Sequence, residues 1–223
     1  MSHFTLIHRD DRIAAFAKPS GLLVHRGWGN DDIVAVDLAR AAVGARVHPV
    51  HRLDRATSGV LLFALDPESA AALGRAFEAG LVHKVYLALV RGVAPDEGVI
   101  DNPVPKTEGG PRIPAVTAFR RRYAGERWSL VEARPRTGRL HQIRRHLKHI
   151  SHPIVGDVNY GKGDINRLFR ERFGLRRLAL HAAELRFLHP FSGDEITIRA
   201  SPPPDLTEPF AQLGIPEDAL AMS

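Results

Sequence analysis

The segment His51–Gly59, with the sequence His-Arg-Leu-Asp-Arg-Ala-Thr-Ser-Gly, carries the side chains best suited to chemistry. Its carboxylate, Asp54, has an imidazole, two guanidiniums and two hydroxyls as sequence neighbours, and the apolar run Val60–Leu65 follows directly. Because a buried strand fixes the polar loop at its end, this pattern favours an active-site loop. The same residues also fit a plain turn, in which Asp54 caps an amide and Gly59 supplies a permissive conformation.

A second constellation begins at the turn Thr137-Gly138 and reads as a helix. Its apolar residues fall at helical spacing: Leu140, Ile143, Leu147 and Ile150. Its basic residues fall on another face, at i, i+3, i+4 and i+7: His141, Arg144, Arg145 and Lys148. The pattern therefore predicts a helix that packs with one side and presents a cationic ridge with the other. A merely solvated basic face is the alternative.

Between these two constellations, the alternating segment Lys84–Val90 predicts a strand, and Tyr86 lies within it. A tyrosine in a strand usually fills a core or an interface. Taken in order, however, the three segments resemble the motifs of the RluA-type pseudouridine synthases: His-Arg-Leu-Asp-x-x-Thr-Ser-Gly, Lys-x-Tyr-x-Ala and Thr-Gly-Arg-x-His-Gln-Ile-Arg. The turn Lys18–Gly21 also fits, and the resemblance extends to about Ala200. Members of this family isomerise uridine to pseudouridine in structured RNA.

The resemblance implies a set of site residues. Asp54 would be the catalytic residue, Tyr86 would stack on the target base near its C5 proton, and Arg144 would lie beside the carboxylate. A guanidinium in that place would orient Asp54 and keep it ionised. Arg52 would help to fill the space that the flipped base leaves. The substrate-contacting residues expected from the motifs are His51, Arg52, Thr57, Arg139, His141, Gln142 and Arg145.

The isomerisation involves no redox change and adds no external group, so we expect neither a cofactor nor a metal. The histidines His146, His149 and His152 suggest zinc, but their i, i+3, i+6 spacing converges poorly on one helix face. Ser58 lacks the Gly-x-Ser-x-Gly elbow of a hydrolase, and Gly161–Asp164 lacks the spacing of a phosphate-binding loop.

Charge and composition favour a polyanionic partner. The 223 residues have a formal net charge of +6 and contain 26 Arg against 5 Lys, and arginine suits phosphate because its planar fork donates bidentately. No apolar run approaches the ~20 residues that span a bilayer, and no secretory apolar region is evident near the start. Without cysteine, disulfides and thiolate sites are excluded. We therefore expect a cytoplasmic protein that binds RNA, with no membrane association and no obligate protein partner, acting as a monomer.

The elements predicted along the chain are strands with few helices. They are a hairpin over 5–9 and 12–18, helices over 34–43 and 67–79, and strands over 60–65, 84–90, 115–123, 128–134 and 195–199. This distribution predicts an α+β fold, a mainly antiparallel mixed sheet with flanking helices and loops, as in the catalytic fold of the pseudouridine synthases. We expect one catalytic domain over residues 1–200 and a loose C-terminal tail over 201–223.

Further segments, among them Leu23–Arg26 and His152–Asp157, resemble the family members that modify tRNA. They imply tRNA as the RNA partner and the uridine at tRNA position 65 as the target. Two alternatives stay open. The substrate could instead be ribosomal RNA, since RNA shape is read by loops, or the chain could be a non-catalytic RNA-binding protein that uses the same basic face.

Overall fold

The computed structural model describes residues 4–26 and 33–222. The first three residues, part of the start searched for a secretory region, lie outside these ranges. The chain forms two compact units: unit 1 runs to His83 and resumes over Ala182–Ser201, and unit 2 comprises Lys84–His181 and the chain from Pro202. The expected single domain over residues 1–200 stays a prediction.

The described residues of unit 1 form two helices and one part of the large sheet. Its elements are β1 (Thr5–Arg9), β2 (Ile13–Lys18), α1 (Ala35–Val43), β3 (His48–Pro49), β4 (Ser58–Ala64), α2 (Pro67–Glu78), most of β11 (Leu180–Leu188) and β12 (Glu195–Arg199). The strand order is β1-β2-β4-β11, with β3 paired to β4 and β12 to β11. The pairs β1–β2, β2–β4, β3–β4 and β11–β12 are antiparallel.

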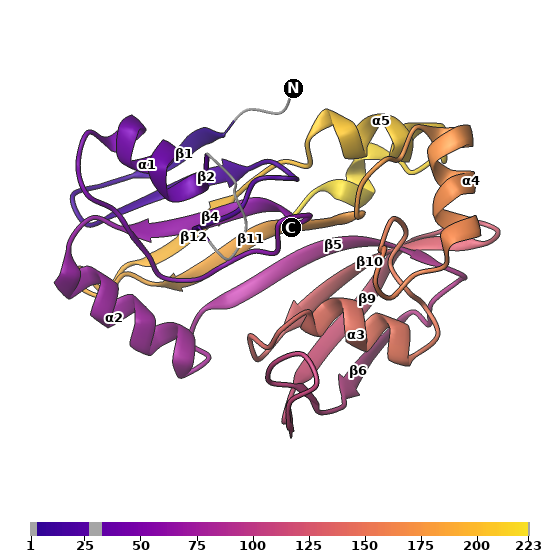
Figure 1. Cartoon of the computed structure of the whole chain (residues 1–223), viewed down its shortest axis with the longest axis horizontal. Helices are drawn as coiled ribbons and strands as arrows, with labels where there is room; N and C mark the ends of the chain where they lie inside the picture. Colours follow the sequence, from indigo (N-terminus) through magenta and orange to yellow (C-terminus); the bar gives the residue numbers. More distant parts are fainter. Residues whose placement is uncertain (1–3, 27–32, 223) are drawn as a thin grey trace. The chain divides into compact units, whose positions relative to one another are not determined.

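Strand β4 is buried along its whole length, because helices cover both faces of the sheet of unit 1. Residues of one parity, including Val60 and Leu62, pack in a cluster with Leu73 of α2. Residues of the other parity, including Leu61, pack with Ala39 of α1. Figure 1 shows α1 and α2 on opposite sides of these strands. Burial on two faces explains why the sequence of β4 is a continuous apolar run rather than an alternation.

Unit 2 contains a second group of antiparallel strands and the remaining helices. Its elements are most of β5 (His83–Arg91), β6 (Glu97–Asp101), β7 (Val104–Pro105), β8 (Arg112–Ile113), β9 (Val116–Ala124), β10 (Trp128–Pro135), α3 (Gln142–His149), α4 (Gly163–Phe173), α5 (Pro204–Gln212) and the short 3-10 helix η1 (Glu217–Leu220). The strand order is β5-β10-β9-β6, and β7 pairs with β8 in a separate ribbon. The pairs β5–β10, β9–β10 and β6–β9 are antiparallel.

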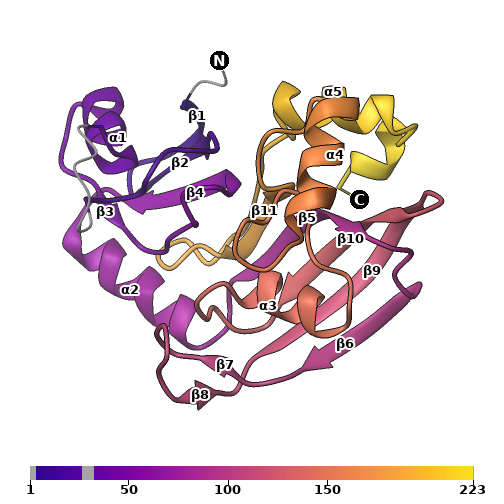
Figure 2. The same ribbon diagram turned by 45° about the vertical axis from the view of Figure 1, so that its right-hand side comes forward.

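Helix α3 covers one face of these strands (Figure 2). Tyr86 of β5 lies opposite Ala133 of β10, which in turn lies opposite Phe119 of β9. Directly opposed residues share a face, and so does Thr117, two positions along β9. Since the Thr117 hydroxyl bonds to Gln142 and to another side chain of α3, α3 and Tyr86 belong to the same face of the sheet.

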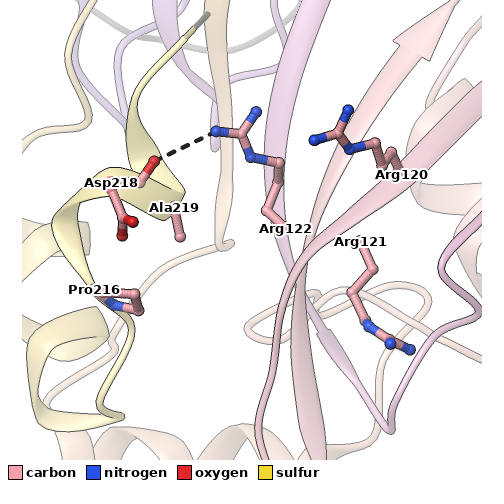
Figure 3. Close-up of a pocket in the computed structure, with 6 residues that line it drawn as sticks. All are labelled: Arg120, Arg121, Arg122, Pro216, Asp218 and Ala219. Atoms are coloured by element: carbon pink, nitrogen blue, oxygen red, sulfur yellow. Dashed lines mark hydrogen bonds between the residues drawn. The ribbon is translucent and has the colours of Figure 1, made fainter.

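The C-terminal segment is not the loose appendage that its sequence suggested. Leu206, Phe210 and Ile215 are buried, and the segment lies beside a pocket lined by Arg120, Arg121, Arg122, Pro216, Asp218 and Ala219 (Figure 3). Arg122 of this pocket donates to the carbonyl oxygen of Asp218 over 3.4 Å and to that of Ala221, outside the pocket, over 2.7 Å. The apolar residues of the tail are scattered among prolines and acids, so no apolar stripe at helical spacing predicted their burial.

The other predicted elements were confirmed within a few residues, as was the α+β class with its large, mostly antiparallel sheet. Elements that the sequence pattern did not predict are β3, β6, the β7–β8 ribbon, β11, α4, α5 and η1. Within the described ranges, no helix combines the length and the apolar composition that a membrane crossing requires.

Candidate active site

In unit 1, Asp54 lies in a tight turn immediately before β4. The amide of Thr57 donates to the carbonyl oxygen of Asp54 over 3.0 Å and closes the turn. Thr57 and Ser58 are buried, Asp54 is half-buried and Arg52 is exposed. The turn thus leaves the carboxylate and the Arg52 guanidinium at its outer side and places the hydroxyl residues inside.

A buried ammonium group anchors this turn. Lys18, at the end of β2, is only 1% exposed. Its Nζ donates to the carbonyl oxygens of Pro19 (2.9 Å), Leu22 (2.7 Å) and Arg55 (3.3 Å). A buried cation is costly unless its donors are satisfied, so these bonds hold the turn after β2 and the Asp54 turn together.

Further bonds join the same two turns. The hydroxyl of Ser20 donates to the carbonyl oxygen of Ala56 over 2.8 Å. The amide of Gly21 donates to the carbonyl oxygen of Arg55 over 2.8 Å, and Nε of Arg55 donates back to the Gly21 carbonyl oxygen over 3.0 Å. The loop that carries Asp54 is therefore fixed on both its main chain and its side chains.

His51 faces the interior of unit 1. Its Nε2 accepts a hydrogen bond from the amide of Leu62 over 2.9 Å, and its ring stacks on Phe77 with the centroids 4.9 Å apart. An accepting Nε2 places the proton of the neutral ring on Nδ1. These contacts give His51 a role in fixing the loop against β4 and α2, and its contact with substrate stays a prediction.

Gly59 is required by close packing of main chain. Its φ is +122°, and a Cβ at this position would lie 2.1 Å from the carbonyl oxygen of Ala182. No other residue type fits without moving β4 or β11. Gly59 therefore permits the close contact between β4 and β11 next to the Asp54 loop.

In unit 2, the buried guanidinium of Arg144 forms two hydrogen bonds with a single carboxylate. Its Nε donates to Oδ2 of Asp157 over 2.8 Å, and its Nη2 donates to Oδ1 over 2.9 Å. Arg144 is 6% exposed and Asp157 is 1% exposed. The exposed cationic ridge that the sequence predicted is therefore wrong at Arg144, because periodicity along α3 could not show that a carboxylate outside the helix would draw this guanidinium inward.

Asp157 is held in its charged form. Burial alone would raise the pKa of its carboxyl group, but the hydrogen bonds from Arg144 and from the amides of Tyr160 and Asn159, with the charge of Arg144, outweigh burial and lower the pKa. Both amides donate to Oδ1, over 3.0 and 2.9 Å. The result is a rigid, charged pair that fixes the orientation of Arg144.

A second group surrounds Tyr160. Its hydroxyl accepts from Nε of Arg145 over 2.7 Å and lies 2.9 Å from Nδ1 of His141. The guanidinium carbons of Arg144 and Arg145 lie 5.1 and 5.6 Å from the ring centroid of Tyr160, and Nζ of Lys148 lies 5.9 Å from it. One aromatic residue thus organises the basic side chains of α3 through its ring and its hydroxyl.

His141 precedes α3 in the left-handed conformation, with φ 52°, which is uncommon for a residue other than glycine. Because Nε of Arg145 can only donate, the Tyr160 oxygen accepts from it. The Tyr160 oxygen has a second lone pair and a hydrogen of its own, so the direction of its bond with Nδ1 of His141 follows the imidazole tautomer.

Gln142 is buried and uses both ends of its amide to hold the turn before α3. Its Oε1 accepts from the Thr137 hydroxyl (2.7 Å) and from the Arg139 amide (3.0 Å). Its Nε2 donates to the Val116 carbonyl oxygen (2.9 Å) and to the Thr117 hydroxyl (3.0 Å). The side chain therefore fixes the turn to β9, while Arg139 itself is exposed.

The structure gathers the predicted residues within each unit. His51, Arg52, Asp54 and Thr57 share the loop of unit 1, and Tyr86 lies on the face of unit 2 that α3 covers, with Arg139, His141, Gln142, Arg144 and Arg145 on or just before that helix. No role was predicted from the sequence for the side chains of Lys18, Asp157 or Tyr160. Lys18 and Asp157 lie in segments that fit the family resemblance, and Lys18 is also a lone cation at the end of the apolar strand β2. Tyr160 lies in a loop without periodicity.

Among the described residues, no three His, Asp or Glu side chains gather in a way that could hold a metal ion. Of the histidines considered for zinc, His146 of α3 is engaged elsewhere. Its ring nitrogens lie 2.9 Å from the Thr117 hydroxyl and 2.8 Å from the Asn102 carbonyl oxygen. Desolvation lowers the pKa of His146, which favours the neutral ring.

Known proteins are similar to this chain in sequence and in fold. A sequence model described as RNA pseudouridylate synthase matches residues 12–149. Since the match spans more than half of the chain, the protein belongs to the RNA pseudouridylate synthase family, as its motifs indicated. Over 220 residues the chain is 43% identical to a protein of Pectobacterium carotovorum named tRNA pseudouridine synthase C.

The extent of the matches differs between relatives. The alignment with the Pectobacterium protein covers 87% of this chain but only 58% of that relative. A protein of Vibrio cholerae with the same name is 39% identical over 218 residues, covering 87% of this chain and 89% of the relative. Among solved structures, the human RNA pseudouridylate synthase domain containing 4 superimposes with a TM-score of 0.78 at 27% identity, covering 94% of this chain and 93% of the human chain.

Proposed function

We propose that this protein is a pseudouridine synthase that isomerises a uridine of tRNA, with Asp54 as its catalytic carboxylate. The single observation that carries the proposal is the Asp54 loop, because a family motif is held rigidly there by the buried Lys18 at the end of a buried strand. Family membership and the names of the relatives support it. The resemblance of further segments to members that modify tRNA favours position 65 as the target.

The reaction breaks the N-glycosidic bond of uridine, turns the uracil and rejoins it to the ribose through C5. The C5 proton is lost and N1 gains one, so no external reactant is consumed. A carboxylate serves here as a nucleophile or as a stabiliser of the detached sugar, and this is the role of Asp54. The target must leave its helix, at a cost of a few kcal/mol, and stacking on Tyr86 recovers on the order of 1–3 kcal/mol.

The other predicted residues have supporting roles in this proposal. Arg144 assists Asp54, and Arg52 fills the space that the flipped base leaves. The remaining substrate-binding residues are His51, Thr57, Arg139, His141, Gln142 and Arg145. Thr57 and Gln142 are buried, so they act on the substrate through the backbone that they hold in place.

The proposal extends to the setting in which the protein works. We place it in the cytoplasm, acting as a monomer, and we expect no cofactor because isomerisation consumes no second substrate. Two rival functions remain as outcomes of the test: a synthase that modifies ribosomal RNA and a non-catalytic RNA-binding protein.

The test uses purified protein without cofactors, incubated separately with unmodified transcripts of tRNA and of ribosomal RNA fragments. Pseudouridine is mapped by carbodiimide labelling and primer extension. The variant Asp54→Asn should lose all product while its RNA affinity stays within a few-fold, because the shape of the side chain is kept and its charge is removed. Asp11→Asn, an exposed aspartate of the same unit, is the matched control and should be fully active.

Each outcome has a definite meaning. One modified site in tRNA, lost only in Asp54→Asn, supports the enzyme, its carboxylate and its substrate class together. Modification of ribosomal RNA alone overturns the choice of substrate. Tight binding without product on either RNA overturns the enzyme and supports the binding protein.

A further inference from the structure

The positive charge of this protein is concentrated in unit 2. Counted from the sequence, the residues assigned to unit 1 have a net charge of −1 and those of unit 2 a net charge of +7. The segment Lys162–Arg177 alone contributes +4, from six basic and two acidic residues. This segment includes α4, which none of the synthase motifs covers, so its charge is not explained by the proposed active site.

Two arginines of α4 form an exposed basic pair. Arg167 and Arg170 lie at i and i+3, and therefore on one side of the helix. Within the described part of the chain, Arg170 has no ion partner, and Arg167 pairs with Asp164 over 2.7 Å at the surface, where both side chains are exposed. Exposed pairs of this kind are weak, so a phosphate can replace Asp164. The other acid of the helix is Glu171, which is also exposed.

Helix α4 is connected to Arg144 by hydrogen bonds. The amide of Gly156 donates to Oδ1 of Asn166 over 2.9 Å, and Nδ2 of Asn166 donates to the carbonyl oxygen of Asp157 over 2.9 Å. The carboxylate of the same Asp157 holds Arg144. The side chain of Asn166 thus hydrogen-bonds to the main chain of Asp157, the residue that orients Arg144.

The packing of the loop between them is tight. A Cβ on Gly156 would lie 1.9 Å from the carbonyl oxygen of Arg177, and one on Gly161 would lie 2.4 Å from that of Asp157. The buried Phe169 fixes the inner face of α4. The distance between α4 and Arg144 is therefore set by close contacts rather than by a flexible linker.

We propose that Arg167 and Arg170, here called the α4 surface, dock the RNA backbone outside the target nucleotide, at a distance from Arg144 that Asn166 and Asp157 fix. The inference rests on the proposed function and deepens it. Arginine is suited to phosphate because its fork donates bidentately. An RNA is accepted when two of its phosphates reach the α4 surface while its uridine is presented for reaction, so the helix measures RNA shape rather than sequence.

The first experiment removes the two charges. Arg167→Gln/Arg170→Gln should raise KM for the tRNA transcript on the order of tenfold and leave kcat within twofold. The slope of log affinity against log salt should fall by about 1.4–1.8, since each lost phosphate contact contributes about 0.7–0.9. The matched control is Arg46→Gln/Arg186→Gln, which removes two exposed charges from unit 1 and should leave KM and the salt slope within error.

Comparing the two double variants distinguishes failure of the docking proposal from failure of the proposed function. If both double variants change the salt slope equally, or neither does, the α4 surface does not dock RNA. If the wild-type protein forms no pseudouridine, the proposed function fails, and the salt slopes of binding still decide whether α4 contacts RNA.

The second experiment tests Asn166 as a positioning residue. Asn166→Ala should lower kcat about tenfold with KM little changed, since the α4 surface remains but its distance to Arg144 is no longer fixed. Asn166→Asp keeps the acceptor for the Gly156 amide and should recover part of the rate. Combined with Arg167→Gln/Arg170→Gln, the alanine change should cost less in kcat/KM than the two changes added together. Strict additivity in folded variants would show that α4 and Arg144 work independently.

Discussion

Arg144 and Asp157 form a buried ion pair with two parallel hydrogen bonds, 2.8 and 2.9 Å long. This geometry fixes the plane of the guanidinium before any substrate arrives, and a preorganised donor costs no reorganisation during the reaction. The residue that the family motif marks as a partner of Asp54 is thus itself held by a carboxylate thirteen positions further along the chain.

Removing the charge of Asp157 should be costly. In Asp157→Asn a buried guanidinium loses its ion partner, and we expect the free energy of unfolding to fall by about 3–5 kcal/mol. Urea unfolding followed by circular dichroism measures it. Glu126→Gln, an exposed acid of the same unit, should change stability by less than about 0.5 kcal/mol. A similar small loss in both variants would contradict a structural role for the pair.

The same pair predicts a pH dependence of stability. The pKa of Asp157 is lower in the folded protein than its usual value, so the folded state favours the ionised form. The resulting stabilisation is complete above the unfolded-state pKa of about 3.9 and is lost as the pH falls through the lower folded-state pKa. The stability difference between wild type and Asp157→Asn should therefore be constant from pH 5 to 7 and shrink below about pH 4. Unfolding curves over this range measure it, and a difference at pH 3 as large as that at pH 7 would refute the assignment.

Tyr160→Phe should loosen the positions of the basic side chains around Tyr160 without unfolding the protein. The ring that the cations surround is kept, but the hydroxyl bound by Arg145 and His141 is lost. A hydrogen bond to a charged donor contributes about 1.5–3 kcal/mol, so we expect kcat/KM for the RNA to fall at least tenfold. The control is Tyr123→Phe, whose ring stacks on Trp128 and whose activity should not change. Equal activity of the two variants would mean that the Tyr160 hydroxyl does not position these side chains.

Gly59→Ala should be among the most damaging single-methyl changes in unit 1. The added Cβ would lie 2.1 Å from the Ala182 carbonyl oxygen, in a conformation with φ +122° that alanine avoids. We expect a loss of at least about 2–3 kcal/mol in the free energy of unfolding. Gly74→Ala, within α2 and with nothing near its added methyl group, should instead gain about 0.5–1 kcal/mol. Thermal unfolding of both variants gives the sign, and a loss of stability in Gly74→Ala matching that of Gly59→Ala would contradict the steric explanation.

Local patterns were sufficient where the structure depends on near neighbours in the chain. The continuous apolar run after Gly59 gave β4, and the spacing of Ile143 and Leu147 gave α3, whose buried side they form. The motif order identified the family. Helix α4 was missed because its charged residues occupy most of its surface and only Phe169 is buried, which leaves almost no apolar stripe to detect.

The sequence by itself therefore determined the family, the fold class and the residues that are candidates for chemistry, because these follow from residue types at short spacing. Only the tertiary structure decided what holds them: Lys18 inside the turn that supports Asp54, Asp157 drawing Arg144 away from solvent, and Tyr160 joining His141 to Arg145. Each of these contacts brings together groups from different segments in a buried setting. Their energetic value depends on burial, and burial is a property of the folded chain rather than of its sequence pattern.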